Sequence, residues 1–238
     1  RMFPSDLAGS LDDFIFLRTL QAGKPILYYS QNFPYYDAAK LGRFTPLAGM
    51  EYNLFGLFSK SPSPFWYYFY HAVQFVIFAV LLVKLIGKTT SNKWLIYGIP
   101  ILISLVPGFA ISFFRMQMNE RNVIFFFAAF LLCYLAYLEK RKWFYAVSSF
   151  LFAAIAVYYK ETAFIALGTF TFSHLILSWK TTDRKIKILD TALLLNAISY
   201  IAIYVLYVLP HKMPFPGTSD PLSLQKATTF IKNILNYA

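Results

Sequence analysis

The sequence predicts an all-α, polytopic membrane protein. Of its 238 residues, 58% are hydrophobic and 20% aromatic, whereas only 14% are charged. A soluble domain usually carries about 25% charged residues, so this deficit indicates an apolar solvent. The apolar residues gather in runs of about 17–23 residues, which as helices can cross a hydrocarbon core of about 30 Å. This composition excludes a disordered chain, a coiled coil and a nucleic-acid-binding domain.

Six apolar stretches are predicted to be transmembrane helices. Their ranges are 64–86, 94–114, 122–138, 143–159, 162–179 and 188–209. A barrel strand would need apolar and polar residues to alternate, and residues 123–132 do not. Pro100 and Pro107 are predicted to kink the second stretch, which membrane helices tolerate when neighbours satisfy the freed carbonyl groups.

The distribution of basic residues between alternate helix connections predicts how the helices are oriented in the membrane. One set of connections holds ten of them: Lys84, Lys88, Lys93, Lys140, Arg141, Lys142, Lys180, Arg184, Lys185 and Lys187. The other set holds four: Arg115, Arg121, Lys160 and Lys212. Because Lys and Arg near helix ends are retained in the cytoplasm, the first set is predicted to be cytoplasmic. The net charge of +11 therefore reflects topology rather than a polyanionic partner.

Three regions follow from this orientation. Residues 1–63 are predicted to form an outer-face loop, periplasmic or lumenal, with amphipathic helices over 11–22, 35–41 and 43–58. Residues 64–209 form the bundle of six helices, and residues 210–238 begin a further outer-face region. The chain starts with Arg1 and ends in what resembles an incomplete segment, so we expect a piece of a longer protein with another helix before residue 1.

Asp12 and Asp13 are adjacent carboxylates in the predicted outer loop. Two acids there could bind a divalent cation, or one could deprotonate an acceptor hydroxyl group while the other orients it. The alternative is that they only stabilise the first turn of a helix capped by Ser10, where the helix dipole favours anions.

Two further pairs of charged residues lie in outer-face connections. Arg121 offers donors for a phosphate group, and Glu120 offers a carboxylate to a metal ion or acceptor; the alternative is an ion pair in a solvated loop. Lys160 and Glu161 interrupt about 35 apolar residues, so they are candidate site residues, although a hairpin turn would also need polar residues.

Histidines and aromatic residues supply weaker candidates. His71 lies in the first predicted span on one face with Gln74, where it could bind a phosphate group, carry a proton or simply bond a neighbouring helix. His174 and Asp190 are expected to be structural or interfacial. Tyrosines in the outer loop could stack on sugar rings: Tyr28, Tyr29, Tyr35 and Tyr36. The single cysteine, Cys133, excludes an intrachain disulfide.

Three segments resemble the GT-C superfamily of integral-membrane glycosyltransferases, which use polyprenyl-phosphate-linked sugars. The segments are 11–16 (LDDFIF); 42–47 (GRFTPL) with 52–57 (YNLFGL) and 70–74 (YHAVQ); and 119–121 (NER) with 134–138 (YLAYL) and 160–163 (KETA). In that order, the three segments are similar to three motifs of the superfamily. These are the acidic motif of the first outer loop, a long run that also belongs to the first loop, and the acidic residue of the second outer loop together with a lysine-glutamate motif. The branch includes the protein O-mannosyltransferases with tetratricopeptide tails, and the resemblance covers residues 11–180.

The resemblance implies sugar transfer on the outer or lumenal face of a membrane, either the bacterial inner membrane or the endoplasmic reticulum. It makes Asp12 or Asp13 the catalytic or metal-binding carboxylate and Glu120 the second-loop acid. Arg43 and Glu161, which fall within the resembling segments, are expected to bind substrate. Arg121, Lys160 and His71 are phosphate candidates from their charge and position. Mg²⁺ or Mn²⁺ at the two aspartates stays an open alternative, because metal dependence differs among such families.

Two other classes of function stay open. A transporter or flippase would use Lys160, Glu161, His71 and kinked helices as a polar pathway, but it would need ionisable residues near the middle of the membrane on several helices. A non-catalytic membrane subunit would keep the fold as a scaffold for other membrane subunits. The expected partners are membrane lipid and polyprenyl phosphate sugar, and nucleic acid is not expected.

Overall fold

The structure is a computed structural model that describes residues 44–52, 64–114 and 118–211. Within these ranges every regular element is helical, and none is a strand. The elements are η1 (Met50–Tyr52), α5 (Pro64–Thr89), α6 (Lys93–Leu105), α7 (Pro107–Phe114), α8 (Asn119–Lys140), α9 (Trp143–Tyr159), α10 (Ala163–Ser178), α11 (Arg184–Ile203), η2 (Tyr204–Val208) and η3 (Leu209–His211). The predicted all-α class is confirmed.

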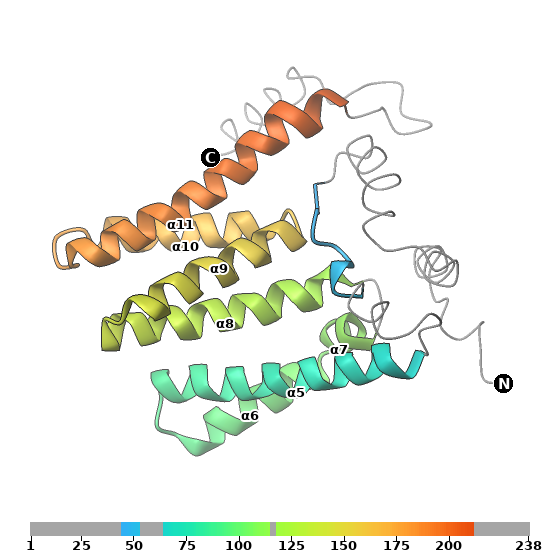
Figure 1. The fold of residues 1–238 in the computed structure, drawn as a ribbon. Coiled ribbons are helices and arrows are strands. Elements are labelled where there is room, and N and C mark those ends of the chain that lie inside the picture. The colour runs from blue at the N-terminus through green and yellow to red at the C-terminus, as the bar shows by residue number, and fades with distance from the viewer. Residues whose placement is uncertain (1–43, 53–63, 115–117, 212–238) are drawn as a thin grey trace, which may run out of the picture.

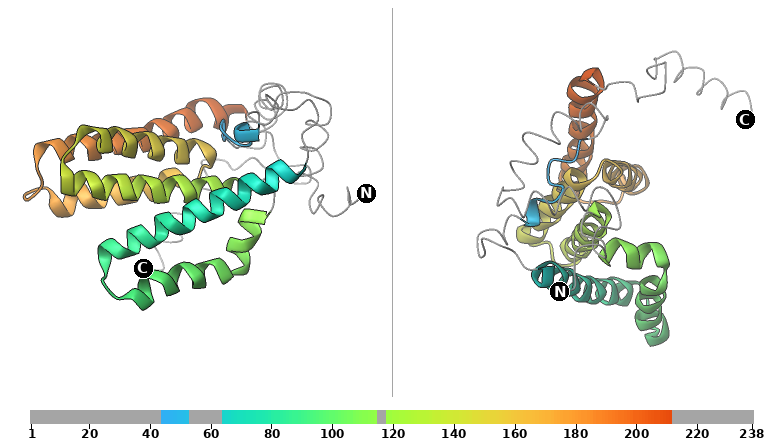
Figure 2. Two further views of the ribbon diagram at one scale, coloured as in Figure 1. Left: turned by 60° about the horizontal axis from the view of Figure 1, so that its bottom comes forward. Right: turned by 90° about the vertical axis from the view of Figure 1, so that its right-hand side faces the viewer.

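The helices form a bundle in which α8, α9, α10 and α11 run in alternating directions, as do α5 and α6 (Figure 1). α8 packs against α9 and α10 against α11, while α5 lies along the other side of α8 (Figure 2). Two ends of the bundle result. The loop end holds residues 44–52 together with the start of α8 and the end of α9. The basic end, opposite, holds the connections α5–α6, α8–α9 and α10–α11 with the ten basic residues of the first predicted set.

Each of the six predicted apolar stretches is helical, but some boundaries differ. α8 begins at Asn119, three residues before the predicted start, so Glu120 and Arg121 lie in its first turn and not in a connecting loop. The N-terminal position of Glu120 is favourable because the helix dipole attracts anions there. α11 begins at Arg184 because the Asp183 side chain accepts a hydrogen bond from the Lys185 backbone N–H group and caps the helix.

The two prolines of the second stretch behave differently. Val106 is extended, as expected for a residue that precedes proline, and the chain bends by 77° between α6 and α7. α6 continues through Pro100, whose ring is buried. The predicted kink is therefore confirmed at Pro107, where the helix also breaks, whereas Pro100 lies within a continuous helix.

Within the described residues, three helices are long and apolar enough to cross a membrane, or four if α6 and α7 form one broken span. The three are Phe65–Thr89, Asn119–Lys140 and Arg184–Val208. α9 and α10 are apolar but shorter, with 17 and 16 residues. Large apolar side chains also cover the outer surface, among them Leu177, which is 84% exposed. These features are consistent with a membrane protein.

The main core lies between α8, α9, α10 and α11. Phe130, Val157, Leu167, Leu193 and Tyr200 are all fully buried there. Small residues let the helix backbones approach, since Ala153, Ala156 and Ala197 are buried in the same layer. This rigid packing fixes the side chains at both ends of the bundle.

Candidate functional site

Residues 44–52 dock on the loop end of the bundle. The Leu47 backbone N–H group donates to the Tyr158 carbonyl at 3.2 Å, and the Tyr200 hydroxyl donates to the Phe44 carbonyl at 2.5 Å. The Phe44 ring packs edge-on against Tyr158. Gly49 has a φ of 76°, which favours glycine, and it turns the chain so that η1 follows at once. The segment is thereby fixed on α9 and α11.

Glu51, in η1, forms the centre of a buried polar network. Its carboxylate accepts hydrogen bonds from Arg121 Nη2 at 3.3 Å, Asn122 Nδ2 at 2.6 Å and the Tyr159 hydroxyl at 3.1 Å. Asn122 Oδ1 in turn accepts from Gln74 Nε2 at 2.8 Å. The network therefore joins the 44–52 segment to α5, α8 and α9.

The charges of this network are almost fully removed from solvent. The Arg121 side chain is 0% exposed and that of Glu51 is 7% exposed. Burial raises the pKa of the Glu51 carboxyl group above its ordinary value, while Arg121 and the donated hydrogen bonds oppose that rise. The Arg121 guanidinium also lies 5.8 Å from the centre of the Tyr70 ring, a cation–π arrangement. A buried guanidinium needs such partners, because an unpaired charge in the interior is very costly.

Lys160 and Glu120 form a second ion pair at the same end. Lys160 follows the last residue of α9, and Glu120 lies in the first turn of α8. Their side chains are 27% and 41% exposed, in contrast to the buried Arg121 beside them. This pair is therefore the charged part of the cluster that a solute or lipid headgroup can reach.

The structure brings together three of the predicted site residues: Glu120, Arg121 and Lys160. His71 lies on the inner face of α5, 4% exposed, with Gln74 buried on the same face as predicted, and Tyr67 is buried there too. Glu161 lies in the turn between α9 and α10, within electrostatic range of Tyr200. Asp12, Asp13 and Arg43 lie outside the described residues.

Sequence reasoning missed Glu51, the residue on which the network depends. One signal was present, because Glu51 is the only acidic residue between Asp37 and Glu120 and it stands in a largely apolar segment. Asn122 and Tyr159 gave no comparable signal, since an amide or a tyrosine at a helix end is common. Their role depends on which side chains meet in the folded bundle.

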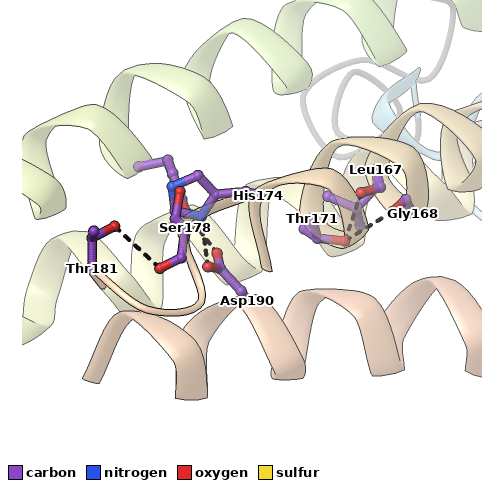
Figure 3. Close-up of polar contacts among 8 residues, drawn as sticks. Leu167, Gly168, Thr171, His174, Ser178, Thr181 and Asp190 are labelled. Carbon is purple, nitrogen blue, oxygen red and sulfur yellow. Dashed lines mark hydrogen bonds and ion pairs between the residues drawn. The ribbon is translucent and has the colours of Figure 1, made fainter. Parts of the chain in front are cut away.

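A separate polar cluster lies near the basic end. Asp190 on α11 is 1% exposed and accepts a hydrogen bond from the Tyr134 hydroxyl on α8 at 2.6 Å. Its second oxygen lies 2.8 Å from Nδ1 of His174 on α10, and Figure 3 shows these two side chains facing each other across the helix interface. Tyr134 also contacts His174 Nδ1 at 2.9 Å. The cluster therefore ties three helices together.

Replacing Tyr134 with phenylalanine is expected to destabilise the bundle by about 1–3 kcal/mol, because a buried carboxylate loses a hydrogen-bond donor. Thermal unfolding in detergent measures the change. Tyr137→Phe is the matched control: Tyr137 is buried on the same helix, its hydroxyl has no hydrogen bond among the described residues, and we expect its substitution to cost less. Equal effects of the two substitutions would contradict the role of the Tyr134–Asp190 bond.

Among the residues described, no group of three or more His, Cys, Asp or Glu side chains is placed to hold a metal ion. Asp12 and Asp13, the expected ligands of Mg²⁺ or Mn²⁺, are outside this part of the chain. Comparison with protein-family models, curated proteins and solved structures gives no match. In the part of the chain that the structure describes, fold and site define an all-α bundle with three or four long apolar helices and a buried ion-pair network at one end.

Proposed function

We propose that the chain is an integral-membrane glycosyltransferase of the GT-C type. It moves a sugar from a polyprenyl-phosphate-linked donor to an acceptor on the outer or lumenal face. The loop end is the active face, and the basic end is cytoplasmic by the distribution of Lys and Arg. Three lines of support are the helical bundle, the charged cluster at the loop end and the resemblance of residues 11–180 to that superfamily.

The proposal includes six membrane crossings. α8 and α11 are long enough to span, and the intervening α9 and α10 begin and end at the same two ends of the bundle. If the two longer helices cross, the chain must also cross through the two shorter ones. At 1.5 Å per residue α9 is roughly 26 Å long, close to the hydrocarbon thickness of about 30 Å.

The single observation that carries the proposed chemistry is the half-exposed Lys160–Glu120 pair beside the docked 44–52 segment. A cation at that position can stabilise the leaving polyprenyl phosphate. A donor phosphate would compete with Glu120 for Lys160, and the released Glu120 carboxylate could then orient the acceptor. Arg121, which is fully buried against Glu51, acts in this arrangement as a positioning residue rather than as a phosphate ligand.

The reaction is a single displacement at the anomeric carbon. The acceptor oxygen forms the new bond to that carbon, the bond to the phosphate oxygen breaks, and polyprenyl phosphate leaves with the electron pair. Asp12 or Asp13 takes the acceptor's proton as the general base, in the role that the resemblance gives them. Both aspartates precede the 44–52 segment in the sequence. That segment is docked at the same end of the bundle as Lys160.

A transporter is the second candidate, because one observation favours it. Tyr134, His174 and Asp190 form an ionisable cluster on three helices, away from the loop end. Ionisable groups inside a membrane bundle often mark an ion or substrate pathway. Substrate movement across vesicles that depends on Asp190 but not on Lys160 would favour transport over transfer.

Lys160→Ala is expected to weaken the apparent affinity for the lipid-phosphate donor by about tenfold or more, with a smaller effect on the rate at saturating donor. The reason is that the lost charge contacts a phosphate group that is present before and during the reaction. Initial rates of sugar transfer at varied donor concentration separate the two effects.

Lys88→Ala serves as the matched control, since Lys88 also pairs with a glutamate on α8 but lies at the basic end. We expect the Lys88→Ala variant to bind the donor with the same affinity as the unmodified protein. An unchanged donor affinity in Lys160→Ala would refute the assignment of Lys160 to the donor site.

A further inference from the structure

The basic end carries a dense positive surface that the transferase chemistry does not use. Nine of its ten Lys and Arg residues are exposed and the tenth, Lys187, is partly exposed. In the described part of this end the exposed acids are Glu139 and Asp183. Glu139 pairs with Lys88, and Asp183 caps α11. Most of the positive charge is therefore directed to solvent or to an external partner.

Each of the three connections at this end also places an exposed tryptophan next to a lysine. Trp94 follows Lys93, Trp143 follows Lys142, and Trp179 precedes Lys180. Their exposed fractions are 88%, 74% and 58%. Tryptophan is enriched where one end of a side chain is apolar and the other is wet, as at the headgroup layer of a bilayer.

The α10–α11 turn is the densest part of this surface. Four basic residues fall within residues 180–187: Lys180, Arg184, Lys185 and Lys187. The Lys187 ammonium lies 4.8 Å from the centre of the Trp179 ring. The contact places the ammonium group and the aromatic ring side by side at the same end of the bundle. One partner can therefore contact both the charge and the ring.

Exposed apolar side chains continue directly from this basic rim toward the middle of the bundle. Leu177 is 84% exposed and Ile176 58% exposed on α10, and Ile188 is 60% exposed on α11. A soluble polyanion such as a nucleic acid would cover the charges but leave these side chains in water. A bilayer with negatively charged headgroups covers both.

From this combination we infer that the basic end is a binding surface for anionic phospholipids, with the α10–α11 turn as its principal site. The headgroup phosphates contact the lysines and arginines, while the acyl chains lie against the apolar side chains below. The inference does not rest on sugar transfer, because it requires only that the bundle be embedded in a membrane.

The test uses the full chain in nanodiscs that contain phosphatidylcholine alone or mixed with phosphatidylglycerol. The lipids that stay bound after extraction into detergent are counted by native mass spectrometry. We expect the protein to retain phosphatidylglycerol in about tenfold excess over its share of the mixture. The variant K180Q/R184Q/K185Q/K187Q should lose most of that excess, and T181A/T182A in the same turn should keep it.

Equal retention of the two lipids by the unmodified protein would overturn the inference, as would an excess that survives in the quadruple variant. Displacement of the bound lipid by low concentrations of inorganic phosphate would assign the surface to a soluble anion instead. If the quadruple variant does not fold, K180Q and K185Q are tested separately. Each is expected to lower the excess by about twofold, because four cations that contribute independently share a roughly tenfold preference.

Discussion

Glu51→Ala is expected to destabilise the bundle by about 3–5 kcal/mol, because it removes a carboxylate that pairs with the fully buried Arg121 guanidinium. Arginine cannot lose its proton in a protein, so the buried charge persists at every accessible pH. Thermal or denaturant unfolding of the detergent-solubilised protein measures the loss. The docked 44–52 segment should also become more accessible to proteases, since Glu51 joins it to α8 and α9.

Arg121→Met is expected to cost less than Glu51→Ala, and its cost should depend on pH. Burial already raises the pKa of Glu51, and removal of the guanidinium raises it further. A carboxyl group with a raised pKa in the folded state favours folding at low pH, and that contribution is lost as the pH rises through the folded-state pKa. The variant should therefore be closest in stability to the unmodified protein in acid.

The control for both substitutions is the Lys88–Glu139 pair, which joins α5 to α8 at the basic end. The Glu139 side chain is 52% exposed, so Glu139→Ala should cost less than about 1 kcal/mol. The double variant with Glu51→Ala and Arg121→Met should lose less than the sum of the single losses. Additive losses would contradict a direct coupling between the two residues.

Replacing both Asp12 and Asp13 with asparagine is expected to lower sugar transfer by about a hundredfold or more. The proposed reaction needs a carboxylate to take the acceptor's proton, and asparagine keeps the size but cannot accept a proton at neutral pH. Transfer of radiolabelled sugar from a polyprenyl phosphate donor into membrane acceptors measures the rate. Circular dichroism and unfolding of the same samples confirm that the helices are retained.

Asp6→Asn and Asp37→Asn are the matched controls, because they remove carboxylates from the same region of the chain. Both should transfer sugar at an unchanged rate. Undiminished transfer by the Asp12 and Asp13 double variant would remove these residues from the catalytic role. A uniform loss in all the variants would instead indicate a general effect of charge.

The positions of the helices were predictable because apolar runs bounded by basic residues are a local signal. The start of α8 was not, since a polar run at residues 119–122 also suits a connecting loop. Those residues continue the helix because Glu51, 70 residues before Arg121 in the chain, neutralises Arg121 and binds Asn122. A partner at that sequence distance leaves no periodic pattern, so the network became evident only in the folded bundle.

The different behaviour of the two prolines was also not predictable from the sequence. Both stand in one apolar run, and the sequence predicts a kink at each. Pro107 interrupts the run because Val106 before it is extended. At Pro100, α6 continues and the Ser104 hydroxyl donates to the Pro100 carbonyl at 2.7 Å, an added bond within the same helix. Which proline would end a helix depended on the local packing and hydrogen bonds.

Photo-crosslinking with a polyprenyl phosphate whose headgroup carries the reactive group tests the proposed donor site most directly. We predict saturable labelling of peptides that contain Lys160 or Glu120, lowered in Lys160→Ala and competed by unlabelled polyprenyl phosphate sugar. Labelling confined to the basic end, or labelling that competitor does not reduce, would contradict a donor site at the loop end.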